Sequence, residues 1–172
     1  MNTTLFYISF AELGLSLLIG VLVLFLTQKT VRYLLNRNQQ VEVNNLAATI
    51  FVSSVLFSTG YIISGCVQPV INSFRALSNS GQDGALLIFN GLRYTAVFVL
   101  IGMLVAGIAN TVTFYLYSSL TKGINELDEI RNNNTQVAVI VAVILVVICL
   151  FVKDGYVLMI ESLVPRVSVT FN

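Results

Sequence analysis

Four apolar stretches, each long enough to cross a bilayer as a helix, dominate this chain of 172 residues. A hydrocarbon core about 30 Å thick needs around 20 helical residues, because an α-helix rises about 1.5 Å per residue. The sequence therefore predicts an all-α, polytopic membrane protein with four transmembrane helices. We expect these helices at about residues 5–26, 46–67, 94–116 and 136–160.

The composition agrees with a membrane protein and argues against soluble classes. Hydrophobic residues make up 56% of the chain and charged residues 10%, which leaves too little polar surface for a soluble globule of this size. The net charge is only +1 and the basic residues are scattered, so we expect a lipid bilayer and not nucleic acid as the partner. The first stretch has no preceding Lys or Arg and no small-x-small cleavage site, so we interpret it as a retained helix.

The two halves of the chain are similar to each other. In each half, an asparagine-led helix start opens an apolar run that ends at a glycine. We interpret this order as a duplication into two parallel two-helix repeats, since an even number of spans gives both halves the same orientation. Residues 1–68 then form the first repeat, 69–92 a linker with room for a short interfacial helix at 70–77, and 93–172 the second repeat. A shift of ninety residues aligns Asn44 with Asn134, Ala48 with Ala138, Ile50 with Ile140, Gly65 with Gly155, and Val67 with Val157.

The Lys and Arg residues near the ends of the spans indicate an orientation. The first connector is short and holds Lys29, Arg32 and Arg37 close to the helix ends, so its positive charges contribute most to the assignment of orientation. We therefore expect both polar connectors to be cytoplasmic and both termini to be extracytoplasmic.

The connectors carry features of their own. Leu120, Ile124 and Leu127 recur at helical spacing, which predicts that the third helix continues beyond the bilayer as an amphipathic extension. Its acidic residues suggest a docking surface for a cytoplasmic protein partner, and the alternative is a helix end that packs on its neighbour. The docking candidates are Glu126, Asp128 and Glu129.

Asparagines stand before the second and fourth spans, at 44–45 and 132–134. Their side chains can accept hydrogen bonds from the first free backbone N–H groups of each helix, so we expect N-caps there. Residues 41–50 (VEVNNLAATI) and 129–140 (EIRNNNTQVAVI) resemble the repeat signature of the YjfL-type bacterial inner-membrane family, although Leu46 and Val137 depart from its pattern. The resemblance implies a tandem two-helix architecture, a bacterial inner-membrane location and kinship with proteins discussed beside membrane-stress systems. It implies no established activity.

Several charged residues are drawn toward the membrane by the lengths of the apolar runs. The uninterrupted run 13–26 rises only about 21 Å, so a full crossing by the first helix includes Glu12. The fourth run is interrupted in the same way near its end. The resulting charge cluster comprises Glu12, Arg93, Lys153 and Asp154.

Two interpretations of this charge cluster remain open. Its members fix helix depth by snorkelling to the headgroups, or they line a polar cavity in which a carboxylate binds a proton or a cation. Polar residues inside the spans either extend such a path or form hydrogen bonds between helices. These pore or packing candidates are Asn110, Thr111, Ser54 and Ser58.

Nothing in the sequence indicates catalysis. The chain has no histidine, phosphate-binding loop, nucleophile elbow or paired metal-ligand motif, so we expect no enzymatic activity, cofactor or metal. Cys66 and Cys149 are expected to pack as ordinary apolar residues. Small residues in all four spans favour a compact four-helix bundle, and a homo-oligomer of such units is a further expectation.

The sequence therefore favours a membrane-embedded interaction or stress-response component without catalytic activity. The alternative is a small ion or proton channel or transport unit that uses the charge cluster.

Overall fold

The computed structural model describes residues 3–36, 45–80, 84–120 and 126–165, and these residues are almost entirely helical. No strand occurs in these ranges, so the prediction of an all-α protein is confirmed. The helices are α1 (Thr3–Asn36), α2 (Leu46–Ser64), α3 (Val67–Asn79), α4 (Gly84–Leu120), α5 (Glu126–Arg131) and α6 (Thr135–Glu161).

Four helical stretches of the described chain are long and apolar enough to cross a membrane, as the sequence predicts. They are Ser16–Leu35, Leu46–Asn79, Gly84–Ser119 and Thr135–Glu161. The helices themselves run further than the predicted spans, since α1 continues to Asn36 and α4 begins at Gly84. Arg93 does not interrupt α4, because its side chain is exposed on the helix surface. The chain is thus a multi-pass membrane protein.

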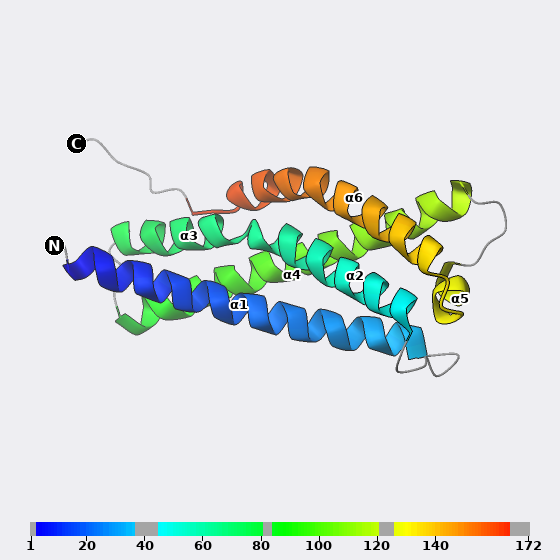
Figure 1. The fold of residues 1–172 in the computed structure, drawn as a ribbon. Coiled ribbons are helices and arrows are strands. Elements are labelled where there is room, and N and C mark those ends of the chain that lie inside the picture. The colour runs from blue at the N-terminus through cyan, green and yellow to red at the C-terminus, as the bar shows by residue number, and fades with distance from the viewer. Residues whose placement is uncertain (1–2, 37–44, 81–83, 121–125, 166–172) are drawn as a thin grey trace.

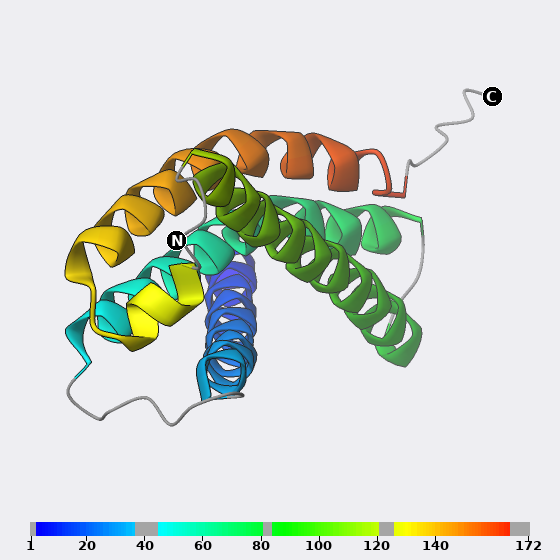
Figure 2. The ribbon, with the colours of Figure 1, turned by 90° about the vertical axis from the view of Figure 1, so that its right-hand side faces the viewer.

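The central helix of the bundle is α2, which contacts α1, α4 and α6 (Figure 1). Its closest packing is along α6, and the two helices run in the same direction. Helix α1 leans on α2 and has only slight contact with the other described helices. Helix α4 crosses the bundle obliquely, as Figure 2 shows. The start of α1 and the end of α6 lie at one end of the molecule, and α5 lies at the other.

A break at Gly65 separates α2 from α3. Gly65 ends α2 as its C-cap, and α3 then continues toward the same end of the bundle. Helix α3 packs on α4, where the Phe74 ring lies over Gly91. The segment 69–92, assigned to a linker from the sequence, therefore contains most of α3 and the first turns of α4. Helix α3 includes residues 70–77, where the sequence predicts a short helix.

Apolar side chains form two buried clusters, one toward each end of the bundle. The cluster near α5 includes Phe51, Ile130 and Leu145. The other includes Phe98 and Tyr156, and the Tyr156 hydroxyl donates a hydrogen bond to the Phe98 carbonyl at 2.8 Å. Both cysteines are free and buried, as ordinary apolar packing requires.

The helices of the two halves bury corresponding positions. In the register of ninety residues, buried positions of α2 and its continuation meet buried positions of α6. Because α2 and α6 run side by side, their equivalent faces are turned toward each other. The corresponding buried pairs are Ala47 and Val137, Ala48 and Ala138, Phe51 and Val141, Val55 and Leu145, Thr59 and Cys149, Cys66 and Tyr156, and Val70 and Ile160.

Candidate functional site

A network of polar side chains joins the two halves at the end of the bundle where α5 lies. We call it the connector clasp, and it links the end of α1, the start of α2, α5 and the start of α6. Its members are Asn45, Asp128, Glu129, Arg131, Asn133 and Asn134.

Asn45 serves two helices at once. Its side chain accepts a 2.7 Å hydrogen bond from the backbone N–H of Ala48 and so caps the start of α2. Its amide nitrogen donates to the carbonyls of Ile130 and Arg131, at 3.0 and 2.9 Å, and so satisfies the end of α5. Asn45 is buried, which makes these bonds costly to lose.

Arg131 reaches from α5 to the end of α1. Its Nε donates to the Leu35 carbonyl at 3.0 Å, and its Nη2 donates to the Leu34 carbonyl at 3.1 Å. The last carbonyls of a helix have no partner within it and carry partial negative charge, so a guanidinium stabilises them. Its Nη1 also pairs with Asp128 at 2.8 Å, and the Arg131 side chain is only 7% exposed.

Asn133 and Asn134 complete the clasp. Asn133 adopts a positive φ of 63°, and its side chain accepts a hydrogen bond from the Ala47 N–H at 3.1 Å. Asn134 is the N-cap of α6 and accepts from the Val137 N–H at 3.4 Å. The expectation of asparagine N-caps is thus confirmed at Asn45 and Asn134.

Two of the three predicted docking candidates, Asp128 and Glu129, belong to this network. Asp128 pairs with Arg131, and Glu129 accepts a 2.8 Å hydrogen bond from the Asn134 side chain. Glu126 begins α5, and its side chain lies outside the described part of the chain. Helix α4 ends at Leu120 and α5 packs against α2, α4 and α6 as a separate short helix, with residues 121–125 outside the described ranges.

The three members of the predicted charge cluster whose side chains are described form no ion pairs with one another. Lys153 lies on α6 with its ammonium 4.2 Å from the centroid of the Tyr61 ring of α2, a cation–π contact. Arg93 and Asp154 are exposed, and no ion pair joins Arg93, Lys153 and Asp154 within the described ranges. Glu12 lies in α1, and its side chain is outside the described residues.

The polar candidates inside the spans divide into two groups. Ser58 of α2 donates to the side-chain oxygen of Asn110 on α4 at 2.9 Å, which makes a hydrogen bond between helices. Ser54 and Thr111 instead donate to carbonyls of their own helices, each at 2.8 Å. The structure therefore brings Ser58 and Asn110 together and leaves Ser54 and Thr111 as local contacts.

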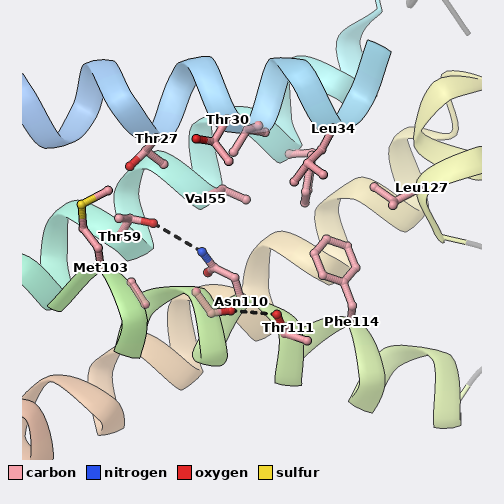
Figure 3. A pocket seen from close by; sticks show the side chains of 14 residues that line it. Thr27, Thr30, Leu34, Val55, Thr59, Met103, Asn110, Thr111, Phe114 and Leu127 are labelled. Carbon is pink, nitrogen blue, oxygen red and sulfur yellow. Dashed lines mark hydrogen bonds between the residues drawn. The ribbon is translucent and has the colours of Figure 1, made fainter. Parts of the chain in front are cut away.

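A cavity of about 400 Å³ lies beside Asn110, between α1, α2 and α4 (Figure 3). We call it the lateral groove. Leu127 of α5 lines the groove near the connector clasp, and the walls of the groove are mainly apolar. Sequence reasoning missed Thr27 and Thr30 of α1, which also line it. Hydroxyls in an apolar helix usually bond to their own backbone, so their position alone does not indicate a cavity.

Comparisons with known proteins identify a family but no activity. No curated protein and no solved structure matches the chain. A family model described as Domain of Unknown Function (DUF350) matches residues 1–155, a range that contains the connector clasp and the lateral groove. This match confirms the prediction of an uncharacterised family. The chain therefore belongs to the family described as Domain of Unknown Function (DUF350).

Proposed function

We propose that this protein is a non-enzymatic, multi-pass component of the bacterial inner membrane that acts by interaction with other proteins, as part of a membrane or stress-response assembly. Its cytoplasmic connectors present the docking surface, with both termini on the opposite side. The observation that carries the proposal is the connector clasp, which fixes α5 against both halves of the molecule.

A fixed connector suits a docking role. A helix of six residues is not stable alone, yet α5 is held by hydrogen bonds from Asn45 at its end and through Arg131 to α1. A surface ordered before binding loses little conformational entropy when a partner arrives. The Asp128 side chain remains 54% exposed, so it offers negative charge to a partner with basic residues.

The second candidate is a small ion or proton channel or transport unit. Lys153 over the Tyr61 ring and the Ser58–Asn110 hydrogen bond support it, because ionisable and polar groups within membrane helices often mark ion paths. The exposure of Arg93 and Asp154 weighs against it, since groups on the outer surface do not line a shared interior path.

The exposed apolar side chains of α1, α4 and α6 are suited to contact with lipid. The same faces leave room for a homo-oligomer, which we retain as a proposal.

The docking role can be tested by photo-crosslinking in living cells. A photoreactive phenylalanine analogue at position 132, an exposed residue whose backbone N–H donates to the Asp128 carbonyl, should give a discrete protein adduct, identified by mass spectrometry, that is lost in the Glu126→Gln, Glu129→Gln double variant. Gln at 129 can still accept the hydrogen bond from Asn134, so the change removes charge and not the contact. The same analogue at position 154, an exposed acid on α6, is the matched control. Identical adducts at the two positions, or lipid adducts alone, would contradict the proposal.

A further inference from the structure

We propose that the lateral groove binds a neutral, lipid-soluble molecule with a compact carbonyl-bearing head and an apolar tail, the chemical class that includes isoprenoid quinones. The inference is independent of the docking role, because it concerns a cavity between membrane helices. At about 400 Å³, the groove falls within the range of roughly 300–1,000 Å³ that is common for small-molecule sites.

Unused hydrogen-bond donors gather in one part of this groove. Thr27 is 8% exposed and Thr59 is 5% exposed, and within the described chain neither hydroxyl donates to an acceptor. Asn110 uses one of its amide N–H groups, at 3.4 Å from the Thr59 oxygen, and has a second available. Figure 3 shows these side chains on three helices, on the part of the groove away from Leu127. Thr30 differs, because it donates to the Leu26 carbonyl at 2.9 Å.

These donors define the head of the ligand. A buried donor without an acceptor destabilises the structure, and no bulk water is available inside a bilayer to supply an acceptor. Two hydroxyls and one amide N–H call for acceptor oxygens, which carbonyl groups provide. Among the described residues, none that lines the groove is charged, so a charged head would be buried without a partner there.

The remainder of the groove defines the tail. Val31 and Leu34 of α1, Phe114 of α4 and Leu127 of α5 line it beyond the polar group. An apolar chain fills such a surface, whereas water would meet few polar partners there.

The neutral lining also distinguishes this ligand from a phospholipid, whose phosphate would find no cationic partner among the described residues that line the groove.

Tryptophan fluorescence provides the test, because the chain contains no tryptophan. Phe114→Trp places a reporter in the groove, and Phe151→Trp places a control on α6 at a residue that is 80% exposed. Decylubiquinone is titrated into proteoliposomes of each variant. We expect saturable quenching at 114 and only linear, collisional quenching at 151.

Substitutions of the polar residues in the groove then test the proposed hydrogen bonds to the head of the ligand. In the Phe114→Trp background, Asn110→Leu should weaken apparent binding by about tenfold and Thr27→Val by a few-fold, as expected for lost hydrogen bonds. Thr27→Val keeps the size of the side chain, so it remains informative if Asn110→Leu does not fold. Linear quenching at both reporters overturns the proposal. Saturable binding that neither polar variant weakens, or equal competition by decylbenzene, which has the tail without carbonyls, also overturns it.

Discussion

At the residue scale, Arg131 connects the second half of the chain to the first. Its guanidinium donates to two carbonyls at the end of α1 and pairs with Asp128, in nearly complete burial. Lysine keeps the charge but cannot reproduce this fork of donors. We expect Arg131→Lys to lower the free energy of unfolding by about 2 kcal/mol, measured by reversible denaturation in detergent.

Asp128→Asn is the matched control for Arg131. It removes only the exposed partner, so it should cost no more than about 1 kcal/mol. Equal losses from the two substitutions would show that the carbonyl contacts to α1 do not contribute.

Gly102 permits the close approach of α4 to α6. A Cβ at this position would lie 2.7 Å from the Tyr156 hydroxyl and 3.1 Å from Ile63. We expect Gly102→Ala to destabilise the fold by about 1–3 kcal/mol, because Tyr156 must move from its hydrogen bond to Phe98. A Cβ at position 155 would have no neighbour within 4 Å, so we expect Gly155→Ala to be neutral or slightly stabilising. Comparing the thermal unfolding of the Gly102→Ala and Gly155→Ala variants therefore separates the effect of packing from the effect of helix propensity.

The residue types predicted the helix N-caps but not the additional long-range hydrogen bonds that residues of the connector clasp form. Asparagine before an apolar run predicts an N-cap, and Asn45 and Asn134 fill that role. The bonds from Asn45 to α5 and from Arg131 to α1 join residues far apart in the chain. Local sequence carries no signal for such contacts, so the connector clasp could not be predicted.

At the scale of the elements, hydropathy predicted the four long helices but not where they end. Helix α4 begins at Gly84, well before the predicted start at residue 94, because residues 84–92 are also compatible with a helix and Arg93 points outward. The lateral groove was not predictable either. It depends on how α1 leans on α2 and away from α4, which is a property of packing and not of any one segment.

The attachment of α5 can be tested through Asn45. We expect Asn45→Ala to cost about 2–3 kcal/mol, since it removes the cap of α2 and leaves two carbonyls of the α5 end without their donor. Backbone hydrogen exchange in α5 should rise at the same time. Asn132→Ala is the control, because Asn132 is exposed and outside the clasp. Unchanged exchange in α5 after Asn45→Ala would contradict its role.

At the scale of the whole molecule, the start of α1 and the end of α6 lie opposite α5. With cytoplasmic connectors, a cysteine introduced at Glu161 should react with a membrane-impermeant maleimide in spheroplasts. A cysteine at Asn132 should react only after lysis. The unaltered chain serves as background, since Cys66 and Cys149 are buried. The reverse labelling pattern would invert the proposed orientation.

The central claim is that the molecule acts by interaction and not by transport. The most direct measurement is ion and proton flux across proteoliposomes that contain the purified protein, with Glu12→Gln as the paired variant. We expect neither protein to exceed the flux of empty liposomes for any ion tested. Flux that appears with the unaltered protein and disappears in Glu12→Gln would contradict this claim and assign the charge cluster to an ion path.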